Sequence, residues 1–140
     1  MARLSSFIYC LNAERTPTID GKGQIINAMG VLSTITPEFI PGAFSFSIIF
    51  SVVDVNLENN NSIQIIFLDN DDNEIINSNV ISLPIDNSQE VISIPKKYRG
   101  LNMCMDLRNV VFEKEGVYKT KVIFNDEMLG INEIYVKGRR

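Results

Sequence analysis

Residues 39–55, Phe39-Ile-Pro-Gly-Ala-Phe-Ser-Phe-Ser-Ile-Ile-Phe-Ser-Val-Val-Asp-Val55, are the stretch that decides the fold. After the Pro41-Gly42 corner, apolar residues occupy every second position from Phe44 to Val52, and serines fill most positions between them. A period of two is typical of a half-buried β-strand. We predict a strand over residues 43–55, with an irregularity at its apolar doublets. We also expect the serine face to be covered, for instance by a second copy of the chain.

The same alternation recurs along the chain, and no segment shows the apolar spacing of an amphipathic helix over three turns. Further strands are predicted at residues 4–12, 24–35, 63–68, 74–83, 91–95, 101–108, 118–124 and 129–137, with a kink at residues 28–30 and a turn at residues 20–23. Eight to nine short strands separated by turns favour two packed antiparallel sheets. The prediction is one all-β domain over residues 1–140, an antiparallel β-sandwich of immunoglobulin-like or C2-like type.

Composition and charge narrow the classes of partner. The chain has 140 residues, 45% of them hydrophobic and 21% charged, which is the balance of a globular domain. Its formal net charge is −4. The basic residues are scattered except for two small groups, Lys96, Lys97 and Arg99, and Lys137, Arg139 and Arg140. Nucleic-acid binding needs many clustered phosphate contacts, so we expect no nucleic-acid partner, although the two groups could form a small basic edge.

The N-terminal region and the cysteines indicate in which cellular compartment the protein is expected. Residues 7–11 are too short an apolar run for a secretion signal, and no run approaches the roughly 20 residues of a membrane span. Cys10 and Cys104 lie in strand-like runs, and a domain with an adequate core does not need to pair them. We therefore expect a cytoplasmic protein with two buried free thiols and no membrane partner.

Few residues offer catalytic or metal-binding chemistry. Histidine is absent, which excludes Ser-His-Asp and Cys-His triads and His-based metal sites. The acidic run at residues 69–74 places Asp69, Asp71 and Asn73 at the spacing of the first three calcium ligands of an EF-hand, but the later ligand positions do not match. A solvated hairpin turn is the preferred interpretation of this run, and a loop calcium site is the alternative.

Other pairs of polar or sulfur-containing residues have structural interpretations. Asp106 and Arg108 share one face of a strand, which favours a surface charge ladder over an acid–base pair. Met103 and Met105 are expected to fill the core rather than bind a soft metal. The prediction is a protein that is not an enzyme, with no catalytic, cofactor-binding or metal-binding residues.

Several short motifs, in their order along the chain, resemble a known family. They are residues 24–32, Gln-Ile-Ile-Asn-Ala-Met-Gly-Val-Leu, then 37–42, Phe67-Leu68-Asp69, Gly116-Val117-Tyr118, and a closing Gly130 with Tyr135-Val136. The sequence is similar in these motifs to a family of small bacterial and phage proteins classified only as a domain of unknown function. The resemblance covers nearly the whole chain and implies an all-β sandwich, but it implies no activity and no catalytic residues.

The function hypothesis follows from these exclusions. We expect a non-enzymatic protein-binding or assembly module that acts through loops or sheet edges, with a second copy of itself as one partner. One alternative is a phage- or island-encoded regulator that inhibits a host factor. Another is a small-molecule or carbohydrate binder that uses the loop carboxylates of Asp69, Asp71, Asp72 and Asp126.

Overall fold

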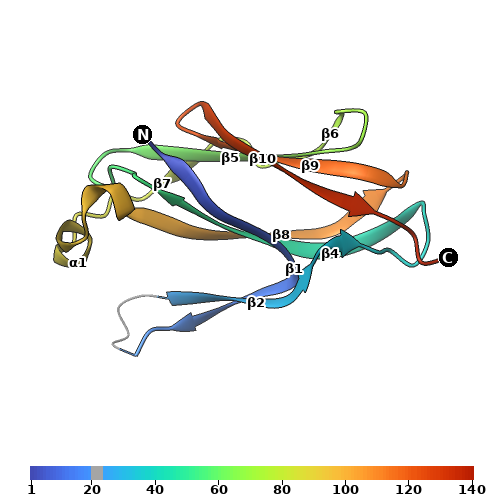
Figure 1. The fold of residues 1–140 in the computed structure, drawn as a ribbon, viewed down its shortest axis with the longest axis horizontal. Helices are drawn as coiled ribbons and strands as arrows, with labels where there is room; N and C mark the ends of the chain where they lie inside the picture. Colours follow the sequence, from blue (N-terminus) through green and yellow to red (C-terminus); the bar gives the residue numbers. More distant parts are fainter. Residues whose placement is uncertain (20–23) are drawn as a thin grey trace. The chain divides into compact units, whose positions relative to one another are not determined.

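The computed structural model describes residues 1–19 and 24–140 (Figure 1). The predicted turn at residues 20–23 lies outside the described residues. The described part of the chain forms ten strands, one short α-helix and one 3₁₀ turn: β1 Arg3–Pro17, β2 Gln24–Leu32, β3 Thr34–Ile35, β4 Gly42–Val53, β5 Asn61–Leu68, β6 Glu74–Asn77, β7 Ile81–Leu83, α1 Gln89–Ser93, η1 Lys96–Tyr98, β8 Gly100–Phe112, β9 Gly116–Phe124 and β10 Glu127–Val136.

The strands form two sheets. One has the order β2-β1-β4-β8, and the other has the order β3-β10-β9-β5-β6, with β7 also paired to β5. The predicted all-β sandwich is therefore confirmed. One detail differs, because the two-residue strand β3 pairs with β10 in parallel. Two backbone hydrogen bonds extend this pairing, from Lys137 N–H to the Ile35 carbonyl and from Arg139 N–H to the Pro37 carbonyl.

The chain divides into two compact units, and five strands, β1, β4, β8, β9 and β10, contribute residues to both. The first unit comprises Met1–Ser5, Ser51–Leu101 and Val117–Glu133, and the second comprises Ser6–Phe50, Asn102–Gly116 and Ile134–Arg140. The part of the chain that the structure describes contains no helix with the length and hydropathy of a membrane span.

The core of the second unit is built on the predicted central strand. In β4, the even-numbered residues Phe46, Ile48 and Phe50 are buried, as the alternation predicts. The Phe46 ring lies between Tyr9 and Phe112, with centroid distances of 6.2 and 6.3 Å. Fully burying an aromatic or aliphatic side chain contributes about 1.5–3 kcal/mol. The other buried apolar residues of this unit are Cys10, Ile35, Pro37, Leu107, Val110, Ile134 and Val136.

The core of the first unit is organised around the antiparallel pair β5 and β9. Their register pairs Ile63 with Phe124 and Phe67 with Thr120. The rings of Phe67 and Tyr118 stack at a centroid distance of 5.8 Å. The hairpin that follows, from β9 to β10, turns through Asn125 and Asp126, both with positive φ. The other buried apolar residues of this unit are Val52, Val55, Leu57, Ile65, Leu68 and Val122.

The prediction of a strand at residues 91–95 is wrong, because residues 91–93 belong to the helix α1. Ser88 caps the helix, since its Oγ accepts a hydrogen bond from Val91 N–H, and Asp86 in turn accepts one from Ser88 N–H. A serine at the N-cap, followed by Gln and Glu in the first turn, favours a helix over a strand. Pro95 then precedes the 3₁₀ turn η1.

Two other predicted strands are divided in the structure. The segment 24–35 breaks at Ser33, so that β2 and β3 belong to different sheets. The segment 74–83 breaks at Asn79, which has a φ of 59°. There Ser78 N–H still donates to the Ile65 carbonyl, but Ile65 N–H donates to the Ser78 hydroxyl, so a side-chain oxygen replaces one backbone acceptor of the pairing with β5. Local side-chain bonds of this kind interrupt a strand without changing its apolar pattern.

Candidate functional site

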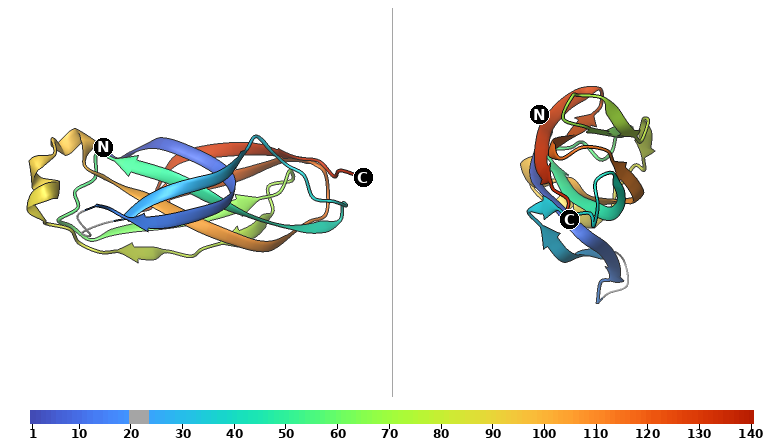
Figure 2. Two further views of the ribbon diagram at one scale, coloured as in Figure 1. Left: turned by 90° about the horizontal axis from the view of Figure 1, so that it is seen from below. Right: turned by 90° about the vertical axis from the view of Figure 1, so that its right-hand side faces the viewer.

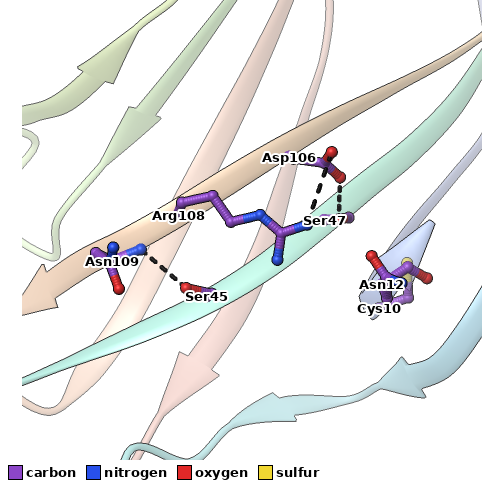
Figure 3. A network of polar contacts seen from close by, with 7 residues as sticks. All are labelled: Cys10, Asn12, Ser45, Ser47, Asp106, Arg108 and Asn109. Carbon is purple, nitrogen blue, oxygen red and sulfur yellow. Dashed lines mark hydrogen bonds and ion pairs between the residues drawn. The ribbon is translucent and has the colours of Figure 1, made fainter.

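The outward face of β4 carries a polar network that includes a buried serine (Figure 3). Ser47 has 0% exposed surface, and its hydroxyl donates a hydrogen bond of 2.5 Å to Oδ1 of Asp106 on β8. The guanidinium of Arg108 lies 3.8 Å from the other carboxylate oxygen of Asp106. Asp106 and Arg108 are thus paired with each other on one strand, and the partner of Asp106 on the neighbouring strand is a serine, whereas the predicted charge ladder pairs them with charges across strands.

A second serine of β4 supports an irregularity in β8. Asn109 has a φ of 53°, and its backbone N–H donates to Oγ of Ser45 at 2.9 Å. A residue with positive φ interrupts the regular pairing of an antiparallel strand, and the serine hydroxyl takes the place of the lost backbone acceptor. Both serines therefore serve the contact between β4 and β8.

This network changes the interpretation of the serine face. The sequence pattern suggested that a partner covers it, but Ser47 is already covered by its own chain. A hydroxyl with no exposed surface is out of reach of a substrate, so Ser47 has a structural part in the fold. Ser45 and Ser51 are half-buried.

Both cysteines are free thiols, as predicted. Cys10 is buried, Cys104 is half-buried, and burial raises the pKa of both thiols. The Cys10 Sγ donates to the Asn12 carbonyl at 3.3 Å. Because β4 separates β1 from β8, their strands are about 9–10 Å apart, beyond the roughly 7 Å that a disulfide can span between Cα atoms. A raised pKa keeps a thiol protonated and unreactive at neutral pH.

The acidic run at residues 69–74 forms a tight hairpin turn between β5 and β6. Oδ1 of Asp69 accepts hydrogen bonds from the N–H groups of Asp71 and Asn73, both at 2.9 Å. Asp72 has a φ of 62°, and its carboxylate lies 3.1 Å from Lys119 Nζ. Asp69 thus closes the turn with the side-chain oxygens that a calcium ion would require. Within residues 1–19 and 24–140, no three acidic or cysteine side chains are placed to hold a metal ion.

Three basic residues of the two sequence groups, Arg99, Lys137 and Arg140, have hydrogen-bond or ion-pair partners inside their own units. The Arg99 guanidinium donates to the carbonyls of Ile94 and Ile92 at 2.7 and 2.8 Å, which fixes the end of α1. Lys137 pairs with Glu115 at 3.4 Å, and Arg140 pairs with Glu38 at 3.7 Å. Each of these charges is therefore engaged in a structural contact.

The β1–β2 hairpin is the most exposed apolar element of the second unit. In Figure 2 the blue hairpin projects beyond the other strands of its sheet. None of the described residues beyond Cys10 in β1, and none in β2, is buried. Yet β2 presents Ile25, Met29 and Val31 with 53%, 47% and 64% of their surfaces exposed. These three share the odd-numbered face of β2, so they form an apolar row along the strand, which we call the β2 row.

The outward edge of β2 has no strand partner in the described part of the chain, because β2 ends its sheet. Proteins protect such edges with charged residues, prolines, breaks or very short strands. The other edge strands follow this rule. In β8 the charged residues Asp106 and Arg108 precede an irregularity at Asn109, β3 has two residues, and β6 has four residues and begins with Glu74. The nine residues of β2 include no charge and no proline.

The sequence alone did not single out β2, although part of the signal was present. Residues 24–32 lack charge and proline, and that is visible in the sequence. The position of β2 at the end of a sheet is a matter of strand order, which a period of two does not determine. The carboxylates proposed for a ligand site are turn residues: Asp69, Asp71 and Asp72 belong to the β5–β6 turn and Asp126 to the β9–β10 turn.

Comparisons with known proteins identify a family and similar structures. The family described as "Family of unknown function (DUF6941)" matches residues 8–137. Among solved structures, an immunoglobulin-like protein from Pseudomonas aeruginosa is similar over 98% of this chain and 97% of its own, with 10% identity and a TM-score of 0.44. A β-glucosidase from Listeria innocua is similar over 88% of this chain and 19% of its own, with 9% identity and a TM-score of 0.41. No curated protein matches this chain.

Proposed function

This chain belongs to the DUF6941 family of unknown function, and we propose that it is a non-enzymatic cytoplasmic module that binds protein through the edge of β2. The observation that carries the proposal is the unprotected edge strand with its exposed β2 row. An edge strand offers a row of backbone donors and acceptors to an incoming strand, and apolar side chains beside it add affinity.

The chemistry of the rest of the chain supports a binding role over catalysis. The sequence has no histidine, the Ser47 hydroxyl is buried and bonded to Asp106, and burial raises the pKa of both thiols. A nucleophile needs access and activation, but Ser47 is buried and neither thiol has a lowered pKa. The β2 row, in contrast, is open to solvent along the whole strand.

Site-specific photocross-linking in cells tests this proposal. The photoreactive amino acid p-benzoylphenylalanine replaces Met29 in the full chain, and the same substitution at Met128 is the control. Met128 is also an exposed methionine on a strand, with 55% of its surface exposed. We expect a discrete covalent protein adduct from position 29 and none of the same mass from position 128.

A further substitution links the adduct to the strand edge. The adduct from position 29 is expected to disappear when Ile25→Lys is added, since a charge on the β2 row opposes docking of an apolar strand. The proposal is contradicted if position 29 gives no protein adduct, if positions 29 and 128 give the same adducts, or if Ile25→Lys leaves the adduct unchanged.

A further inference from the structure

We propose that the partner of the β2 edge is a second copy of this chain, joined by antiparallel pairing of β2 with β2 about a two-fold axis at Asn27. This inference rests on the proposed function and names its partner. Pairing of identical strands around a two-fold axis is self-complementary, so one surface supplies both halves of the interface.

The charge distribution favours a copy of the chain. Copies of a protein with a net charge of −4 repel each other in general. The paired segments of the hairpin, residues 9–17 and 24–32, contain one acidic and one basic residue, Glu14 and Arg15, so their formal charge is zero. No residue of β2 is charged, so two β2 strands meet without placing like charges opposite each other.

The apolar residues of β2 fix the register. With Asn27 on the two-fold axis, Ile25 of one copy lies opposite Met29 of the other, and this contact occurs twice. Ile26 lies opposite Ala28 in the same way, so each pair joins two apolar side chains. Cross-strand apolar pairs of this kind stabilise antiparallel sheets. The pairing joins the β2 strands of the two copies, so that one continuous sheet runs β8-β4-β1-β2 in one copy and then β2-β1-β4-β8 in the other.

Gly30 sets the limit of the paired segment. Its φ of 69° departs from the extended conformation, and this is the kink that the sequence predicted within residues 28–30. The side chain of Leu11 covers Gly30 on the neighbouring strand, 2.9 Å from the position that a Cβ would take. The register about Asn27 relies on residues 25–29, which precede the kink and lie in unbroken register with β1.

Sedimentation of the purified full chain over a range of concentrations tests the pairing. We expect a reversible monomer–dimer equilibrium for the wild-type protein. Ile25→Glu and Met29→Lys should each raise the dissociation constant at least about tenfold, because each buries a charge in the apolar contact. Met128→Lys, a matched change outside β2, should leave the dissociation constant unchanged.

Mixing the two variants tests the register itself. In a mixed pair, Glu at position 25 of one copy faces Lys at position 29 of the other, and the second contact keeps Ile25 opposite Met29. An equimolar mixture should therefore recover the dimer that each variant loses alone. A cysteine test does not depend on those variants: oxidised Asn27→Cys should form a disulfide-linked dimer faster than the exposed control Ser82→Cys.

The outcomes separate this inference from the proposed function. A wild-type chain that stays monomeric while Met29 cross-links to a different protein overturns self-pairing and leaves the binding role in place. Three other results also overturn the β2 pairing. The first is a dissociation constant that Ile25→Glu and Met29→Lys leave unchanged, and the second is an equal increase caused by Met128→Lys. The third is a mixture of the two variants that does not recover the dimer. Circular dichroism of each variant confirms that it is folded, and where a variant is unfolded the Asn27→Cys result decides.

Discussion

Phe46 has no exposed surface, and its ring lies against Tyr9 and Phe112 in the core of the second unit. Phe46→Ala should lower the free energy of unfolding by about 3–5 kcal/mol, since the cavity it leaves cannot be filled by rearrangement of neighbouring rings. Chemical denaturation measures this loss. Phe39, with 55% of its surface exposed, is the control, and Phe39→Ala should cost less than about 0.5 kcal/mol. Equal effects would contradict the position of Phe46 in the core.

The hydrogen bond from Ser47 to Asp106 makes a separate prediction. Ser47→Ala should destabilise the chain by about 1–3 kcal/mol, because the serine side of the bond is buried and its acceptor is a carboxyl group. The exposed Ser82→Ala is the control, with an expected change within about 0.5 kcal/mol. A double-mutant cycle with Asp106→Asn isolates the pair, and additive effects of the two changes would show that the bond contributes nothing.

The buried thiol of Cys10 and the half-buried thiol of Cys104 make stability depend on pH in the alkaline range. Burial raises the pKa of Cys10 and Cys104 in the folded state above the ordinary value of about 8.5. The folded chain therefore holds these protons to higher pH than the unfolded chain. Their contribution is fully present below about pH 8.5 and is lost as the pH rises above it. The free energies of unfolding of the wild type and of the double variant Cys10→Ala/Cys104→Ala, measured by chemical denaturation, should converge as the pH rises. A difference that stays constant with pH would contradict this prediction.

At the scale of the element, the β9–β10 hairpin has its turn residues in the left-handed conformation. Asn125 and Asp126 have φ values of 49° and 64°, a geometry that favours Asn-Gly. Asp126→Gly should raise the free energy of unfolding by about 0.5–1 kcal/mol, since glycine adopts positive φ without strain. Glu133→Gly, within the extended part of β10, should lower it by a similar amount. Opposite signs of the two effects, measured by thermal denaturation, are the expected result.

The same elements show how far the sequence predicts the structure. Alternation located β4, β5, β9 and β10 because burial on one face of a strand is local information. It missed α1, where the Ser88 cap outweighs a short apolar alternation. It also predicted β2 and β3 as one strand, because the pattern of side chains does not reveal that the chain passes from one sheet to the other at Ser33.

Long-range polar contacts were beyond the reach of the sequence. The buried Asn61 donates to the carbonyls of Asn56 and Asn59 and accepts from Asn125, which lies 64 residues away. These bonds fix the loop before β5 against the β9–β10 turn. Asparagine is abundant in this chain, so nothing in its sequence separates Asn61 from its neighbours. The same is true of Ser47, whose partner Asp106 lies on a strand that only the sheet order brings close.

At the scale of the whole molecule, the two-sheet topology is that of an all-β sandwich, and the β2 edge is the feature on which the proposed function rests. The Ser47 network, the thiols and the acidic turn contribute to the stability of the fold. The proposed binding strand, β2, contributes no buried residue to its own chain. We therefore predict that changes in β2 alter association but not the free energy of unfolding of the monomer.

Hydrogen exchange of the backbone amides in β2, followed by mass spectrometry over a series of protein concentrations, tests whether β2 pairs with a second copy of the chain. The peptide that covers residues 24–32 should become more protected as the concentration rises, because pairing at the edge closes its outward amides. The peptide that covers β9, which is paired on both sides by β5 and β10, should not change. Equal exchange of the β2 peptide at every concentration would contradict the pairing of β2 with a second copy.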